Sequence, residues 1–323
     1  MFTAKNLAGC HVAMITPMTR DLPTPRIDWP RLFELTEQLI DAGVTGLLFA
    51  GTTGQSATLS HDEHVEVVLK GAAHAHWYAH EKGRSVQLLA GAGSNSTQEA
   101  IELSLRIAEQ APIEALLHVT GYYNNPPQEG LIAHFEAIAD ALAPRQIPII
   151  LYNVPGRTAS NLAAETTIQL AAHPNIIGIK EASGDLTKVD QIVAATNPDD
   201  FRVVSGEDHL VYEIMRRGGT GVISASANRW PRQFQRLTEL ATAGQWEAAK
   251  ELQEALLPCV KAVFAVKNPI PLACMFDTAV RLPLMELPRL NEATRQKALT
   301  AIETALAIEQ FPCMETEAVS ATS

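Results

Sequence analysis

The stretch Ile176-Ile177-Gly178-Ile179-Lys180 is a short apolar string that ends in a lysine. An apolar run without polar alternation is typical of a strand that is covered on both faces, as in a parallel sheet. Seven further short apolar runs occur along the chain, at residues 10–16, 44–50, 86–90, 115–119, 148–152, 202–204 and 221–224. The chain therefore contains eight candidate strands.

Amphipathic stretches separate these runs. Residues 29–42 place Leu32, Leu35 and Leu39 at helical spacing, and residues 97–110 follow the same pattern with Ser96 or Thr97 as the N-cap. Eight strands that alternate with helices predict an α/β fold, a closed (β/α)8 TIM barrel. A doubly wound open sheet is the alternative, because weak strands are easily miscounted. No G-x-G-x-x-G motif follows the first strand, which disfavours that alternative.

The barrel pattern ends near Asn228. Beyond it, residues 231–257, 259–276 and 289–310 are predicted to be helices. We therefore expect three parts: a barrel in residues 1–228 that carries the active site, a C-terminal helical extension in residues 229–311, and a disordered tail in residues 312–323.

The composition excludes several classes of protein. Of the 323 residues, 46% are hydrophobic and 19% are charged, as expected for a chain with a packed core. Acidic residues outnumber basic ones by 36 to 25, and the net charge of -11 disfavours a nucleic-acid partner. No apolar stretch is long enough for a membrane span, and the N-terminus makes a poor signal peptide. The four cysteines form no CxxC pair, so we expect reduced thiols in a cytoplasmic protein.

Lys180 is the most informative single residue, because a lysine is rare in a strand suited to full burial. Burial lowers the pKa of an amine, and a neutral amine attacks a carbonyl to form a Schiff base. Tyr152 ends the preceding strand, so its phenol is placed to relay protons beside that amine, with Thr52, Thr53 and Tyr123 as further candidates. Arg157 lies in the loop after Tyr152 and suits a carboxylate substrate.

Each of these residues also has a structural interpretation. Taken alone, Lys180 could form an ion pair with Glu181 or Asp185 at the end of its strand. Tyr152 could be a half-buried structural tyrosine, and Arg157 could form an ion pair with an acid on the surface. The histidines at positions 61, 64, 74, 76 and 80 lack the H-E-x-x-H spacing, so we expect surface histidines and no metal site.

Three strings, at residues 51–55, 152–158 and 178–184, resemble signatures of the pyruvate-dependent Schiff-base aldolases of the dihydrodipicolinate synthase and N-acetylneuraminate lyase superfamily. The similarity runs in register from about residue 9 to about residue 283. The pair Thr52-Thr53 and the presence of Arg157 are most similar to the synthases. Two positions depart from the family pattern: Gln55 replaces a glutamate, and Gly121 replaces a proline.

The resemblance implies a mechanism. Lys180 would condense with the ketone of pyruvate, and Thr52, Tyr152 and a Tyr123 from a neighbouring subunit would shuttle protons. Thr53 would bind the pyruvate carboxylate, and Gly206 and Ile223 would line the pocket through their main chain. Arg157 would hold the carboxylate of L-aspartate 4-semialdehyde. The resemblance implies no metal or organic cofactor, and a homo-oligomer, most simply a tetramer built from two tight dimers.

The resemblance also implies feedback inhibition by L-lysine at the tight dimer interface. The matching positions are Ser56, Ala57, His61, His64, Asn95, Glu99 and Tyr122. Alternatively, these residues are ordinary polar side chains of the dimer interface that bind no ligand. For the chain as a whole, two alternatives remain: another 2-oxo-acid aldolase, such as a neuraminate or sugar-acid lyase, and a non-catalytic homologue that acts as a binding protein.

Overall fold

The computed structural model describes residues 2–21, 24–308 and 310–314. Its eight parallel strands pair in sequence order, and β8 closes the sheet by pairing with β1. The strands are β1 (Gly9–Ala13), β2 (Gly46–Phe49), β3 (Gln87–Gly91), β4 (Ala115–Val119), β5 (Ile149–Asn153), β6 (Ile176–Glu181), β7 (Arg202–Ser205) and β8 (Gly221–Ser224). The TIM barrel predicted from the sequence is therefore confirmed, and each of the eight predicted runs overlaps one strand.

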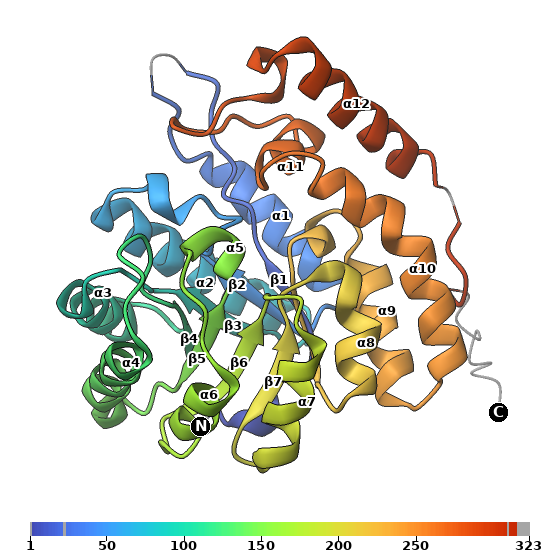
Figure 1. Ribbon diagram of the computed structural model, residues 1–323. Helices are drawn as coiled ribbons and strands as arrows, with labels where there is room; N and C mark the ends of the chain where they lie inside the picture. The colour runs from blue at the N-terminus through green and yellow to red at the C-terminus, as the bar shows by residue number, and fades with distance from the viewer. Residues whose placement is uncertain (1, 22–23, 309, 315–323) are drawn as a thin grey trace.

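Eight helices cover the outside of the barrel (Figure 1). They are α1 (Trp29–Asp41), α2 (His61–Glu81), α3 (Thr97–Gln110), α4 (Gln128–Leu142), α6 (Ala164–Leu170), α7 (Leu186–Ala195), α8 (Val211–Arg216) and α9 (Pro231–Thr242). Helix α3 has the predicted bounds, and the Ser96 side chain caps it by accepting a hydrogen bond from the backbone N–H of Glu99. A one-turn helix, α5 (Pro155–Thr158), lies in the loop after β5.

Two layers of apolar side chains hold the barrel together. The larger layer packs between the strands and the surrounding helices. The smaller layer fills the inside of the barrel and includes Leu48, Leu117 and Ile150. Phe2 and Leu7 belong to this inner layer, so the N-terminal segment closes the end of the barrel opposite α5 (Figure 1). The opposite end, where the strands finish, stays open for a site.

The helices after the barrel differ from the prediction. The predicted helix 231–257 is two helices, α9 and α10 (Trp246–Val263), because Gly244 between them has a φ of +71°, which a helix does not allow. Helix α10 runs through Pro258, where we expected a break. Burial of Leu256, Cys259 and Val263 outweighs the hydrogen bond that the proline removes.

The predicted helix 259–276 is therefore wrong: only its end forms a separate helix, α11 (Ile270–Met275). The last helix, α12 (Glu292–Leu306), is shorter than predicted and packs against α10. Helix α9 packs against β1 and β8, so it serves as the eighth barrel helix. The division into residues 1–228 and 229–311 stays a prediction. Residues 315–323 of the predicted tail lie outside the described residues. Among the described residues, no helix is long and apolar enough to span a membrane.

Two fully buried histidines make the fold sensitive to acid. His11 in β1 has a pKa of about 4 and His118 in β4 a pKa of about 3, both lowered from 6.5 because burial disfavours the charged ring. Below pH 6.5 the unfolded chain therefore binds more protons than the folded chain. We expect each histidine to reduce the free energy of unfolding by up to about 1.4 kcal/mol per pH unit as the pH falls from 6.5 to 4.

Urea unfolding between pH 8 and pH 4 checks this expectation. The His11 ring bonds to the Gln87 side chain at 2.7 Å and fills space above Gly46, so His11→Asn lowers stability at pH 8. The same variant should lose stability less steeply on acidification than the wild type. An unchanged slope would show that His11 does not carry the acid sensitivity.

Candidate active site

A shift in strand pairing turns Lys180 toward the inside of the barrel. Ile149 of β5 pairs with Ile176, but the next residue, Ile150, pairs with Gly178, so β6 contains one extra residue. Side chains of a strand alternate between its two faces, and one extra residue reverses the alternation. Ile177 belongs to the inner layer and Ile179 to the outer one, which leaves Lys180 on the inside.

The amine of Lys180 lies in a cavity at the carboxyl end of the barrel, and the residue is only 6% exposed. Burial lowers the pKa of this amine to about 8, an effect that the charge of Asp208 partly opposes and that of Arg157 reinforces. About a tenth of the amine is therefore neutral at pH 7 and about half at pH 8, and the neutral form is the one that a nucleophilic lysine requires.

Tyr152 lies beside Lys180, because the two residues pair directly across β5 and β6. The Lys180 Nζ atom is 4.4 Å from the centre of the Tyr152 ring. Burial raises the pKa of the phenol to about 12, although the charge of Arg157 and a hydrogen bond with Thr52 lower it. Tyr152 is thus a neutral proton donor whose ring lies beside the amine and whose hydroxyl bonds with Thr52.

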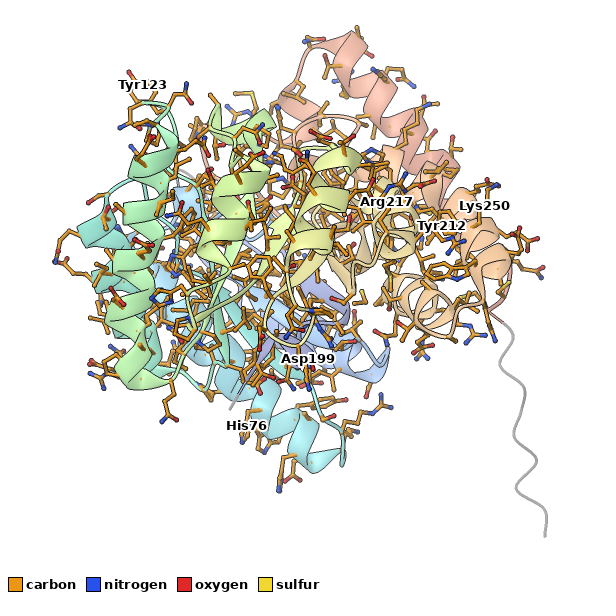
Figure 2. All side chains as sticks on the ribbon, turned by 60° about the horizontal axis from the view of Figure 1, so that its bottom comes forward. His76, Tyr123, Asp199, Tyr212, Arg217 and Lys250 are labelled. Atoms are coloured by element: carbon orange, nitrogen blue, oxygen red, sulfur yellow. The ribbon has the colours of Figure 1, made fainter. Side chains whose placement is uncertain are left out.

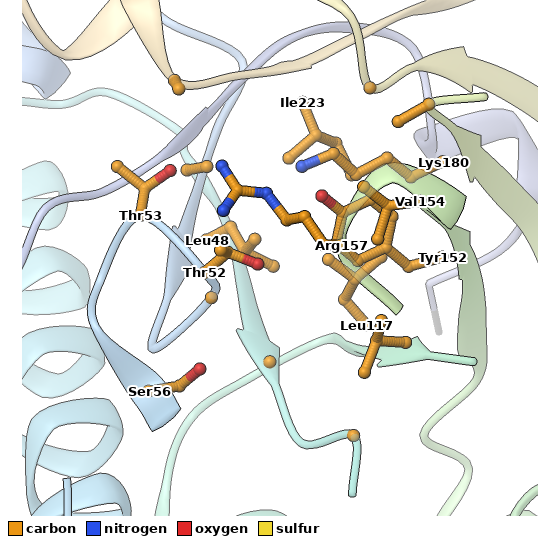
Figure 3. Close-up of a pocket in the computed structure, with 18 of the residues that line it drawn as sticks. Leu48, Thr52, Thr53, Ser56, Leu117, Tyr152, Val154, Arg157, Lys180 and Ile223 are labelled. Atoms are coloured by element: carbon orange, nitrogen blue, oxygen red, sulfur yellow. The ribbon is translucent and has the colours of Figure 1, made fainter. Parts of the chain in front are cut away.

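The turn after β2 supplies Thr52 and Thr53 to the opposite side of the same opening (Figure 3). The Thr53 hydroxyl accepts a hydrogen bond of 2.9 Å from the side chain of Asn268, in the segment before α11. Asn268 is buried and lines the cavity, so the C-terminal extension contributes directly to the site. Sequence reasoning assigned no role to Asn268.

Gln55 fixes this turn to two other parts of the chain. Its backbone has a φ of +60°, and its side chain is buried. The side-chain amide donates to the carbonyl of Thr16 at 3.4 Å and accepts from the backbone N–H of Arg281 at 3.1 Å. A neutral amide serves as both donor and acceptor. Both groups are backbone groups, so glutamine at this position ties neighbouring main chain together without needing a charge.

Arg157 reaches the cavity from α5. Its guanidinium lies across the opening near the amine of Lys180 and the phenol of Tyr152 (Figure 3). Its one hydrogen bond within the described residues is a long contact of 3.5 Å to the carbonyl of Asn268. Most of its five N–H donors therefore remain free to bind a carboxylate.

The end of β7 passes directly against the stem of Lys180. A methyl group placed on Gly206 would lie 3.0 Å from Lys180 Cγ and 2.7 Å from the Ala182 side chain, so only glycine fits there. Glu207 follows and also lines the cavity. Burial and the neighbouring charge of Asp208 raise the pKa of Glu207 to about 7. Sequence reasoning assigned no role to Glu207.

The structure gathers seven of the eight predicted catalytic and substrate-binding residues around one cavity. These are Thr52, Thr53, Tyr152, Arg157, Lys180, Gly206 and Ile223. The eighth, Tyr123, is 91% exposed and stands at the periphery of the molecule (Figure 2). Its backbone has a φ of +74°, a costly conformation for an aromatic residue. Within a single chain, Tyr123 does not reach the cavity.

A second groove adjoins the cavity and shares Thr52 and Arg157 with it. Six of the seven residues predicted to bind lysine line this groove: Ser56, Ala57, His61, His64, Glu99 and Tyr122. The seventh, Asn95, accepts a hydrogen bond of 2.8 Å from the backbone N–H of Tyr122.

Within this groove, the Glu99 carboxylate contacts the His61 ring at 3.1 Å and accepts a hydrogen bond from the Ser94 hydroxyl. The His64 ring bonds to the Gly91 carbonyl, and burial lowers its pKa, so it is neutral at neutral pH. Glu99 is therefore the residue that can bind a ligand ammonium here.

Known proteins are similar to this chain in both fold and sequence. The model of the Dihydrodipicolinate synthetase family matches residues 6–302. The chain is 41% identical over 301 residues to the 4-hydroxy-tetrahydrodipicolinate synthase of Natronomonas pharaonis, which covers 91% of this chain and 97% of that protein. It also resembles the crystal structure of the chloride-inhibited dihydrodipicolinate synthase of Acinetobacter baumannii complexed with pyruvate, at 37% identity and a TM-score of 0.83 over 94% of this chain and 100% of that one.

A further similar structure is the dihydrodipicolinate synthase of Cyanidioschyzon merolae with lysine bound, with 35% identity and a TM-score of 0.83 over 93% of this chain and 98% of that one. The family match and the identity over nine-tenths of the chain agree with the barrel and its buried lysine. The chain therefore belongs to the dihydrodipicolinate synthetase family, whose members are lyase-type synthases of the Schiff-base aldolase superfamily.

Proposed function

We propose that this enzyme is a 4-hydroxy-tetrahydrodipicolinate synthase, which condenses pyruvate with L-aspartate 4-semialdehyde. The observation that carries the proposal is the buried Lys180 amine, 4.4 Å from the Tyr152 ring and in the same cavity as Arg157. Pyruvate supplies a ketone for the amine, and the semialdehyde supplies a carboxylate for the guanidinium. Thr53 and the backbone of its turn bind the pyruvate carboxylate.

The reaction begins when the neutral Lys180 amine adds to the keto carbon of pyruvate. Loss of water gives the imine, and removal of a methyl proton gives the enamine. The enamine carbon attacks the aldehyde carbon of the semialdehyde and forms the new carbon–carbon bond. The amine of the semialdehyde portion then attacks the imine carbon, closes the ring and releases Lys180. Tyr152 and Thr52 move the protons that these steps require.

A two-part experiment tests the proposed function. The protein is treated with pyruvate and borohydride, and mass spectrometry of the peptides locates the adduct. Pyruvate consumption is then measured with aspartate semialdehyde, and cleavage of N-acetylneuraminate is measured for comparison. We expect an adduct on Lys180 and turnover with the semialdehyde only. Cleavage of the neuraminate would identify a lyase, and no adduct would identify a binding protein.

We also propose that the active enzyme is a homo-oligomer, a tetramer built from two tight dimers, in which Tyr123 of one subunit completes the relay of its partner. The exposed, strained Tyr123 supports this assembly, because within its own chain the residue lies outside the cavity that holds Lys180. We expect Tyr123→Phe and Lys180→Ala to be nearly inactive alone. When the two variants are mixed and reassembled, about a quarter of the sites should be active, since half the dimers are mixed and each has one intact site.

Sedimentation of the same samples checks the assembly. Mixed variants that stay inactive while forming dimers would show that Tyr123 does not act across the interface. A fully active monomer at assay concentration would refute the oligomer itself.

L-lysine is proposed to inhibit the enzyme from the second groove. Glu99 pairs with the ammonium of the ligand, and Asn95 and Tyr122 bind its carboxylate. Tyr122 adjoins Tyr123, so ligand binding can shift the relay. Because coupling between sites is typically worth about 1–3 kcal/mol, we expect lysine to change apparent substrate affinity or rate by about 5–150-fold.

Glu99→Ala should abolish this inhibition and leave most of the activity. Glu102→Gln is the matched control, because this residue lies on the same helix and bonds only to Gln98 within the described residues. Lysine that neither inhibits the wild type nor binds in calorimetry would remove the regulatory proposal and leave the catalytic one intact.

A further inference from the structure

Three carboxylates lie at the ends of β6 and β7, and hydrogen bonds from the protein hold two of them in place. Glu181 is buried and accepts hydrogen bonds from the Asn153 side chain and from the backbone N–H of Ser183. Asp208 is also buried and accepts a hydrogen bond of 2.8 Å from the backbone N–H of Ser226. Neither residue lines the cavity. Both carboxylates therefore serve the scaffold.

Glu207 differs from the other two. It lines the cavity with Lys180 and also the mouth of the cavity with Arg157, and its side chain is 31% exposed. Besides the effect of burial, the charge of Glu207 raises the pKa values of Lys180 and Tyr152, and the charges of Lys180 and Arg157 lower the pKa of Glu207. Its one side-chain partner within the described residues is His209, at 3.4 Å. Glu207 is thus the one acid of the three that a substrate can reach.

The mouth of the cavity places this anion and the Arg157 cation beside apolar side chains. Val154, Ala182 and Phe264 line the same mouth, together with the polar Lys267 and Asn268. Charged groups on an apolar, partly dehydrated surface interact more strongly with a charged ligand than they do in open water. A cation and an anion together match a zwitterion, whereas Arg157 alone would accept any carboxylate.

We infer that Glu207 binds the α-ammonium group of the second substrate while Arg157 binds its α-carboxylate, so that the cavity selects an amino-acid aldehyde over a simple oxo-acid. This inference rests on the proposed function and names the residue that gives it specificity. A carboxylate at this point compensates the ammonium, which would otherwise lose its hydration beside the Arg157 cation. Gly206 enables the contact, because it holds the chain of Glu207 against the Lys180 stem.

Kinetics with two aldehydes test the inference. Succinate semialdehyde is aspartate semialdehyde without the amino group. Because it cannot close the ring, its affinity is measured as an inhibition constant against aspartate semialdehyde at saturating pyruvate. The assays are run at pH 8, since the pKa of Glu207 is about 7 and its carboxylate must be ionised. The variants are Glu207→Gln, Arg157→Ala and the control Glu254→Gln, an exposed acid that lines a neighbouring groove with Glu207.

For Glu207→Gln, we expect the KM for aspartate semialdehyde to rise about 10–100-fold, as for the loss of a charged hydrogen bond, with the inhibition constant of succinate semialdehyde almost unchanged. Arg157→Ala should weaken both aldehydes by a similar factor, because both carry the carboxylate. Borohydride trapping of pyruvate should stay normal in Glu207→Gln, and Glu254→Gln should behave as the wild type.

Two results would overturn the inference alone. Equal weakening of both aldehydes in Glu207→Gln would show a general role in the cavity, and an unchanged KM would show that Glu207 does not contact the substrate. A wild type that traps pyruvate but does not consume aspartate semialdehyde would instead disprove the proposed function, and the inference with it.

Discussion

Replacement of Lys180 by alanine or arginine is expected to abolish the pyruvate adduct and to lower kcat by at least about 10³-fold. Alanine removes the nucleophile. Arginine keeps the charge but remains protonated, so it cannot form the imine. Lys267→Arg is the matched control, because Lys267 is an exposed lysine at the mouth of the same cavity.

The pH dependence separates Lys180 from an ordinary lysine. The neutral amine is the reactive form, and the pKa of Lys180 is lowered to about 8 by burial. The rate of adduct formation should therefore rise from pH 6.5 and level off above pH 8 to 9. With an exposed lysine, the rate would continue to rise up to the usual lysine pKa of about 10.4. An adduct on Lys188 or Lys267 would contradict the assignment. Lys188 is buried too, but its amine donates to the Asn161 side chain at 2.6 Å.

The strands were predictable because each is a short apolar run that both the inner and the outer layer bury. The side of the barrel that Lys180 faces was not predictable from the run alone. Strict alternation from Ile177 places Lys180 on the outer face, and only the pairing shift opposite Ile149 and Ile150 reverses it. A pairing shift is a relation between two strands, so no local pattern in β6 reveals it.

The extension was harder to predict for a related reason. A proline such as Pro258 normally ends a helix, but packing of the neighbouring residues overrides that local preference. The sequence pattern also did not indicate the positive φ of Gly244, which separates α9 from α10. The site residues at strand ends could be identified, because a barrel brings all eight ends together. Asn268 enters the cavity from outside that pattern, and the role of Tyr123 requires a second subunit.

Replacement of Tyr152 by phenylalanine is expected to lower kcat by about 10²–10⁴-fold, the usual contribution of a positioned proton donor. The ring would remain at its place beside Lys180, so the cavity should keep its shape and the KM for pyruvate should change little. What disappears is the hydroxyl that bonds with Thr52, and with it the path by which protons reach the imine and the new hydroxyl group. Because the pKa of this phenol is raised to about 12, the phenol is neutral across the assay range. The pH–rate profile of the wild type should therefore show no change below pH 9 that comes from ionisation of Tyr152.

Single-turnover trapping tells whether the Tyr152 hydroxyl acts in chemistry or in packing. In Tyr152→Phe, borohydride should still label Lys180 to completion, but the adduct should form more slowly, because loss of water from the first addition product needs an acid. Tyr212→Phe is the matched control, since Tyr212 packs edge-on against Trp246 on the outside of the barrel. A Tyr152→Phe enzyme with unchanged kcat would assign proton transfer to another group, and one that fails to bind pyruvate at all would mean that the hydroxyl maintains the cavity rather than the relay.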